Sequence, residues 1–78
     1  MSSVEIRTIE RRNFSVKETA AIINVSTDVV YELIRTKNLR CMKIPLIKVP
    51  DFEIDRFLRQ TLEEGIDYTD ILKKEKAS

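Results

Sequence analysis

The residues best suited to chemistry in this 78-residue sequence are basic side chains gathered in one segment. Five lysines and arginines and no acidic residue lie from Arg35 to Lys48. Cations at this density bind phosphate groups when a fold presents them together. A run of like charges is also common on a solvated surface, so the place of this run in the fold must decide between the two interpretations.

The chain lacks the residues of the commonest catalytic and metal sites. It has no histidine and one cysteine, which excludes an internal disulfide, a zinc site of cysteine and histidine, and the commonest general base. No nucleophile or metal-ligand cluster stands out, so we expect neither an enzyme nor a cofactor. No apolar run approaches the roughly 20 residues of a membrane span, and no signal-peptide pattern opens the sequence. We therefore expect a cytoplasmic protein with no membrane partner.

Length and composition predict one small globular domain with a marginal core. Hydrophobic residues make up 42% of the chain and charged residues 35%, unlike a disordered tail. The net charge of +1 conceals an asymmetry. Residues 1–48 carry nine basic and five acidic side chains, or +4, whereas residues 49–78 carry five and eight, or −3.

Two short helices separated by three residues precede the basic run. Ser15 and Glu18 have the spacing of a capping box at the start of the first helix. Asn24 tolerates the left-handed conformation that ends many helices, Val25 is expected to fill the corner, and Ser26 caps the second helix. The apolar residues predicted to face inward are Val16, Ala20, Ile23, Val30, Leu33 and Ile34.

A hairpin and a third helix follow. Lys37-Asn38 is expected to close the second helix, with asparagine in the role that glycine often takes. Residues 39–44 and 47–49 are rich in β-formers and are predicted as two strands, with Pro45 suited to the turn. Asp51 is expected to cap the third helix and Gly65 to end it. The predicted apolar stripe of this helix is Phe52, Ile54, Phe57, Leu58 and Leu62; Phe14, Phe52 and Phe57 are expected in the core, and Cys41 as a core thiol.

We divide the chain into a basic N-terminal arm (1–13), a folded domain (14–64) and a C-terminal tail (65–78). The tail can form a further short helix, with Tyr68, Ile71 and Leu72 on one face. These three residues would offer an apolar patch for self-association or for another protein. The acidic residues of this region, Glu63, Glu64, Asp67 and Asp70, are expected to face away from any phosphate partner of the basic run.

Two helices joined by a three-residue turn form a helix-turn-helix unit. In this unit the first helix braces the second, and the exposed face of the second enters the DNA major groove. Ala20 is small where the helices pack closely, and Asn24 accepts a positive φ in the turn. The sequence therefore predicts a mostly α, α+β fold: three helices, a two-stranded β-hairpin and a short C-terminal helix in the tail.

Residues 14–44, FSVKETAAIINVSTDVVYELIRTKNLRCMKI, followed by KVPDFEIDRFL, resemble the excisionase-type, MerR-like winged helix-turn-helix family. The resemblance covers roughly residues 14–60 and is carried by Ser15 to Glu18, Ala20, Val25, Ser26, Val30, Tyr31, Leu33, Ile34, Leu39, Lys43, Ile44, Val49 and Pro50. It implies a small double-stranded DNA-binding protein. Many members bend attachment-site DNA and direct an integrase toward excision, and others regulate transcription. The resemblance also implies that the hairpin is a wing lying along the phosphates beside the groove.

The sequence departs from the family pattern in three places. Asn24 and Asn38 stand where glycine is favoured, which is a mild change because asparagine also adopts the left-handed conformation. The wing is short, with Pro45-Leu46 at its tip. Acidic residues occupy positions of the second helix that are often basic. These departures leave open a protein-interaction module that has kept the fold without binding DNA.

The residues expected to contact DNA lie on the second helix and the wing: Ser26, Thr27, Asp28, Tyr31, Glu32, Arg35, Lys37, Arg40, Lys43 and Lys48. The outward face of the second helix is predicted to hold five of them: Thr27, Asp28, Tyr31, Glu32 and Arg35.

Three of these residues have more than one interpretation. Asp28 either serves only the helix dipole or accepts from a base edge, and Glu32 either pairs with Arg35 or accepts from a base edge. A third alternative is that the helix does not contact DNA. Tyr31 either contacts a phosphate or thymine methyl, or packs its ring against the wing.

Overall fold

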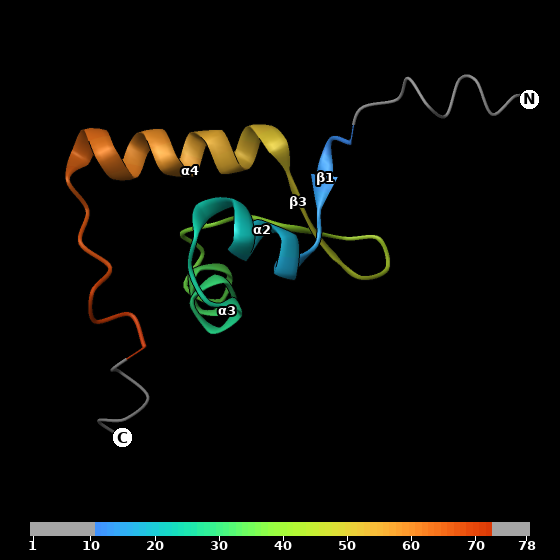
Figure 1. Cartoon of the computed structure of the whole chain (residues 1–78), viewed down its shortest axis with the longest axis horizontal. Helices are drawn as coiled ribbons and strands as arrows, with labels where there is room; N and C mark the ends of the chain where they lie inside the picture. The colour runs from blue at the N-terminus through green and yellow to red at the C-terminus, as the bar shows by residue number, and fades with distance from the viewer. Residues whose placement is uncertain (1–10, 73–78) are drawn as a thin grey trace, which may run out of the picture.

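The computed structural model describes residues 11–72 and has three helices and a small antiparallel sheet (Figure 1). The elements follow in the order β1 (Asn13–Phe14), α2 (Val16–Ile23), α3 (Thr27–Arg35), β2 (Met42–Lys43), β3 (Ile47–Pro50) and α4 (Asp51–Glu64). This confirms the predicted fold class, a small winged helix-turn-helix domain. Most of the predicted N-terminal arm and the last six residues of the tail lie outside the described residues.

The sheet has the strand order β1-β3-β2, with β3 paired antiparallel to both neighbours. The hairpin of β2 and β3 was predicted, although β2 is shorter than expected. Strand β1 was not predicted: Phe14 pairs with Val49, and Asn13 pairs with Pro50. The Asp51 N–H donates to the Arg12 carbonyl at 2.7 Å. The segment before α2 is therefore attached to the start of α4.

The core lies where the helix-turn-helix meets β3 and α4. Helix α2 lies between α3 and α4 in Figure 1, so both of its sides are covered. Val30 and Val49 are fully buried, and Ala20 is small enough to let α2 and α3 approach closely. The buried apolar residues are Val16, Ala20, Val30, Leu33, Leu39, Val49, Ile54 and Phe57.

All three helices end in the same hydrogen-bonded motif. A residue with positive φ follows each helix, and two N–H groups donate back to carbonyls of the last turn, as in a Schellman motif. Asn24 (φ 61°) takes this position after α2, as predicted, and Gly65 (φ 62°) takes it after α4. After α3 the prediction of Asn38 is wrong, because Lys37 has the positive φ of 65°.

Three predicted core positions are wrong. Phe52, Leu58 and Leu62 of α4 are 65%, 43% and 83% exposed. The inner face of α4 is instead formed by Glu53, Ile54 and Phe57. Its N-cap position belongs to Pro50, not Asp51, which is the first helical residue. The helix therefore turns much of its apolar stripe outward.

One further expected core contact differs from the structure, and two others agree with it. Val25 is 38% exposed and does not fill the corner between α2 and α3. The Val25 backbone contributes instead, because its N–H donates to the Ala20 carbonyl at 2.9 Å and so closes the last turn of α2 before α3 begins. Phe14 and Cys41 are partly buried and pack against the core, so the Cys41 prediction is consistent with the structure.

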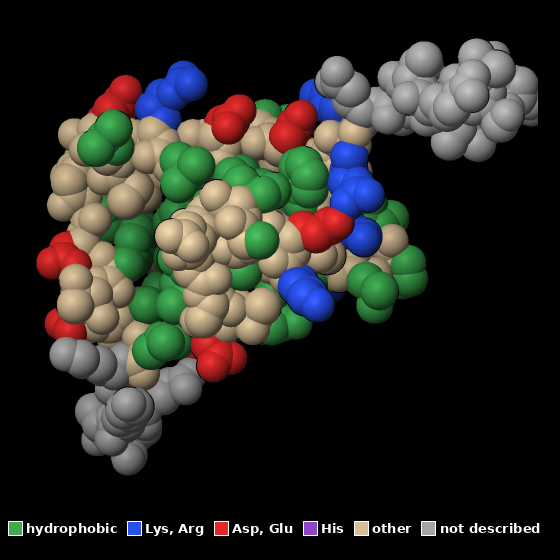
Figure 2. Space-filling model, in the orientation of Figure 1, with side chains coloured by type: hydrophobic (Ala, Val, Ile, Leu, Met, Phe, Trp, Pro, Cys, Tyr) green, Lys and Arg blue, Asp and Glu red, His purple; other side chains and the backbone are tan. Residues whose placement is uncertain are grey.

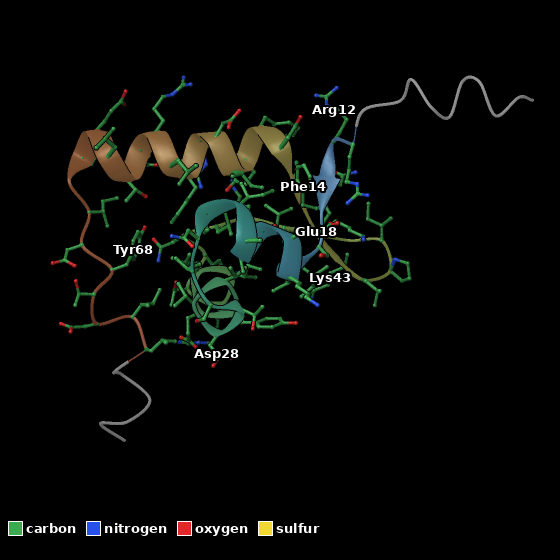
Figure 3. All side chains as sticks on the ribbon, viewed as in Figure 1. Arg12, Phe14, Glu18, Asp28, Lys43 and Tyr68 are labelled. Carbon is green, nitrogen blue, oxygen red and sulfur yellow. The ribbon has the colours of Figure 1, made fainter. Side chains whose placement is uncertain are left out.

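The tail packs against the core instead of presenting an apolar patch. Residues 66–72 contain turns and no helix, which corrects the predicted C-terminal helix. The Tyr68 ring stacks on Phe57 with centroids 5.6 Å apart, and Ile71 packs against the same core. Figure 3 shows Tyr68 on the tail segment that descends from α4 alongside the other helices.

We predict that Tyr68→Ala lowers the free energy of unfolding by about 1–3 kcal/mol, because it removes an aromatic stack on the core. Tyr31→Ala is the matched control, since Tyr31 is 51% exposed and should change stability by less than about 0.5 kcal/mol. Urea unfolding of both variants measures the difference. Equal stabilities would show that the tail contributes nothing to the fold.

A second prediction concerns Thr19, which is fully buried on α2. Its hydroxyl has no hydrogen-bond partner among residues 11–72. A buried hydroxyl without a partner is destabilising, and valine has nearly the same shape. Thr19→Val should therefore raise the urea midpoint, because the free energy of unfolding should increase by about 1 kcal/mol. Thr19→Ala, which removes the hydroxyl but leaves a void, should be less stable than Thr19→Val. A Thr19→Val protein less stable than wild type would show that the hydroxyl is satisfied.

Candidate nucleic-acid interface

Local backbone geometry sets the angle between α2 and α3. Asn24 turns the chain in the left-handed conformation, and the Ser26 hydroxyl accepts from the Val29 N–H at 3.3 Å to begin α3. At the start of α2, the Ser15 hydroxyl accepts from the Glu18 N–H while Glu18 accepts from the Ser15 N–H, each at 3.0 Å. The predicted caps at Ser15 and Ser26 are therefore confirmed, and α3 is held with one face outward.

The outward face of α3 holds four of the residues predicted to contact DNA. Thr27, Asp28, Tyr31 and Arg35 are exposed, and their spacing places them on one side of the helix. Figure 3 shows Asp28 on the side of α3 that faces away from α4. None of the four belongs to the buried core, so this face is available to a partner.

Glu32 does not lie on the outward face, which corrects one predicted position. It is 7% exposed, and its Oε1 accepts from Arg35 Nε at 3.0 Å and from Arg35 Nη2 at 2.8 Å. This geometry matches the interpretation in which Glu32 pairs with Arg35 one turn later. The Arg35 side chain remains 58% exposed, so Glu32 orients a guanidinium that faces solvent.

The segment after α3 presents further cations. The Lys37 N–H donates to the Ile34 carbonyl at 3.0 Å and the Asn38 N–H donates to the Leu33 carbonyl at 2.8 Å, so the left-handed Lys37 is fixed by hydrogen bonds on each side. Lys37, Arg40 and Lys43 then line one hollow with Arg35. The apolar floor of this hollow is Ile34, Leu39 and Cys41. Four of the ten predicted contact residues therefore meet beside the end of α3.

The two lysines of the wing lie on opposite faces of the hairpin. Lys43 is opposite Ile47 across the ladder, whereas Lys48 is opposite Met42, and neighbouring pairs of a ladder point to opposite faces. Lys48 lines a separate hollow near Arg11 and Ile44. The prediction placed both lysines on one backbone-contacting surface; the structure brings Lys43 to the hollow at the end of α3 and Lys48 to the other side of the wing.

A buried carboxylate anchors the start of the wing to α4. Glu53, 6% exposed, accepts from the Arg40 N–H at 2.8 Å and from Arg56 Nη2 at 2.6 Å through the same Oε2 atom. Arg56 also donates to the Asn38 carbonyl at 3.0 Å. Hydrogen bonds from Arg56, and then from the Arg40 N–H, lower the pKa of Glu53 although burial opposes them. Sequence analysis missed this residue; its signal was an acidic side chain within the apolar period of the helix.

The chain belongs to a helix-turn-helix domain family, whose model matches residues 14–62. This match covers the two helices, the wing and most of α4, and it confirms the resemblance on which the sequence prediction relied. No curated protein and no solved structure shows significant similarity to the chain. Helix-turn-helix domains bind DNA through the second helix of the unit, so membership points to DNA as the partner. No helix in the described part of the chain is long and apolar enough to cross a membrane.

We predict an acid-sensitive contribution from Glu53. Because its pKa is lowered in the folded state, the ionised carboxylate stabilises the fold above its unfolded pKa, near 4.5. That contribution should disappear as pH falls through the lower, folded pKa. Glu53→Gln should therefore be less stable than wild type at neutral pH, and the difference should shrink below pH 4.5.

The measurement is urea unfolding of wild type and variant across this pH range. Glu63→Gln, an exposed position on the same helix, is the matched control and should follow wild type throughout. Glu18 and Asp67, whose pKa values are also lowered, contribute equally to all three proteins. A constant difference between wild type and Glu53→Gln at every pH would show that the carboxylate charge is unimportant.

Proposed function

We propose that this protein binds duplex DNA, with α3 in the major groove and the wing against the adjacent backbone. The observation that carries the proposal is the position of the basic hollow. Arg35, Lys37, Arg40 and Lys43 surround it at the end of α3, next to the exposed face formed by Thr27, Asp28 and Tyr31. In this arrangement the cations hold phosphates and fix the register, and the exposed face contacts base edges.

The proposed base contacts come from few side chains. Thr27 and Tyr31 can donate or accept hydrogen bonds, and Asp28 can accept from a cytosine amino group or remain at the helix N-terminus as a dipole partner. Arg35 is oriented by Glu32 and can donate to guanine or to phosphate. Ser26 completes the set at the start of α3, although its hydroxyl is used by the cap.

We further propose an accessory role of the excisionase type, in which the protein shapes attachment-site DNA for an integrase. The resemblance over roughly residues 14–60 supports this role, and a transcriptional regulator on the same fold is the alternative. An integrase encoded beside this chain would supply the assay. Excision that depends on the protein supports the accessory role; promoter repression without an effect on excision supports the regulator.

The basic hollow leads to a salt-dependence prediction. Each neutralised phosphate lowers log affinity by roughly 0.9 per unit of log salt concentration. Lys37→Ala combined with Lys43→Ala should therefore flatten this slope by up to about two and weaken binding to all sequences alike. Substitution of Thr27 or Tyr31 should instead change which sequence is preferred. Fluorescence anisotropy on a selected sequence and on random DNA measures both effects.

The control is Arg59→Ala, which removes an exposed cation from α4 and should leave the slope unchanged. Absence of wild-type binding at low salt, on either DNA, would contradict the proposed function and favour an interaction module. An unchanged slope in the double variant would remove the basic hollow from the DNA surface.

A further inference from the structure

The tip of the wing is apolar and uncovered. Ile44 is 58% exposed and Leu46 is 72% exposed, and the exposed Pro45 lies between them. The Ile44 N–H donates to the Leu46 carbonyl at 2.9 Å, which closes the tip around the proline. Figure 2 shows apolar side chains protruding at this end of the molecule, with Lys and Arg side chains nearby. No function described above uses these three residues.

The charges on the wing indicate what covers the tip. Lys43 and Lys48 lie on opposite faces of the same short ribbon, directly behind the apolar tip. A wing resting along one phosphate strand would use one face only. The DNA minor groove, in contrast, is bounded by a phosphate strand on each side. Cations on both faces of a ribbon complement a groove with anionic walls on both sides.

We propose that the wing enters the minor groove and that Ile44, Pro45 and Leu46 form a wedge between adjacent base pairs. This inference rests on the proposed DNA binding and adds its mode. Proteins that insert isoleucine, leucine or proline into a minor-groove base step partly unstack it and kink the duplex toward the major groove. The kink also widens the groove, which in undistorted DNA is only about 6 Å across.

The wedge would add sequence preference to a helix α3 that offers few base contacts. Its outward face presents Thr27, Asp28, Tyr31 and Arg35, which is a small set of donors and acceptors for base readout. A wedge adds sequence preference without further hydrogen bonds, because pyrimidine–purine steps unstack at lower cost than others. The preferred site should therefore contain such a step at the position of the wing.

The test measures bending separately from binding. Duplex selected from a random pool carries a fluorescent dye at each end, and energy transfer between the dyes gives the bend. Wild type should produce a kink of roughly 20–90°. Ile44→Ser combined with Leu46→Ser should reduce it below about 20° while retaining the salt slope of wild type. Both positions are exposed, so the variant should fold; its urea midpoint checks this.

Leu62→Ser is the matched control, because Leu62 is an exposed leucine on α4, and it should bend DNA as wild type does. Lys43→Ala and Lys48→Ala, tested singly, should each flatten the salt slope by about 0.9. An effect of only one lysine would place the wing along a single strand and overturn the proposal.

Four further outcomes would overturn the wedge proposal. Wild-type binding without a bend, or equal bends by wild type and the Ile44/Leu46 variant, would overturn the wedge and leave the proposed function intact. No binding at all would overturn both. If the tip instead contacts a second copy, sedimentation without DNA should show a dimer that the Ile44/Leu46 substitutions dissociate, and this result would also overturn the wedge.

Discussion

The arrangement of this small domain depends on one buried carboxylate. Glu53 lies on the inner face of α4 and accepts from the backbone N–H of Arg40 and from Arg56, which in turn holds the Asn38 carbonyl. A buried charge is costly unless it is hydrogen-bonded and paired, so the carboxylate requires the segment between α3 and β2 to adopt this path. That path directs Lys37, Arg40 and Lys43 to the same hollow. The acidic residue within α4 thus helps to determine where the cations of the basic hollow lie.

The two elements proposed to contact DNA are supported in different ways. Helix α3 is held by its cap, by its packing on α2 and by the motif at its end. The wing is held at its base, through β3 and the Glu53 contacts, while Ile44, Pro45 and Leu46 at its tip are exposed. A capped and packed helix beside a hairpin with an exposed apolar tip is consistent with the proposed division, in which one element reads a groove and the other deforms the next. We propose that α3 and the basic hollow set the register and that the wing acts on the shape of the duplex.

Most features determined by neighbouring residues were predictable from the sequence, with Asn38 and Asp51 as exceptions, whereas features determined by distant residues were not. The caps of Ser15 and Ser26 and the turn at Asn24 depend on residues within one helical turn. Strand β1 depends on pairing Phe14 with Val49, which no local pattern indicates. The exposure of Phe52 and the burial of Glu53 depend on which side of α4 meets the core. Four of five outward positions on α3 were correct because helical periodicity gives them. The fifth, Glu32, was wrong because its position at the edge of that face lets it turn inward and pair with Arg35.

The division of α3 between exposed and buried residues has a consequence for how this protein can diverge. Thr27, Asp28 and Tyr31 make no contribution to the core, so substitutions there can be sampled with little loss of folded protein. Arg35 and Glu32 are different, because exchanging either one breaks the ion pair between them and so favours a paired change. If α3 reads DNA as proposed, new target sequences are accessible by single substitutions at Thr27, Asp28 and Tyr31. The second half of α3 keeps the Arg35 guanidinium oriented through Glu32 while such substitutions are made. The proposed DNA specificity could therefore change without loss of stability, which matters in a domain with so small a core.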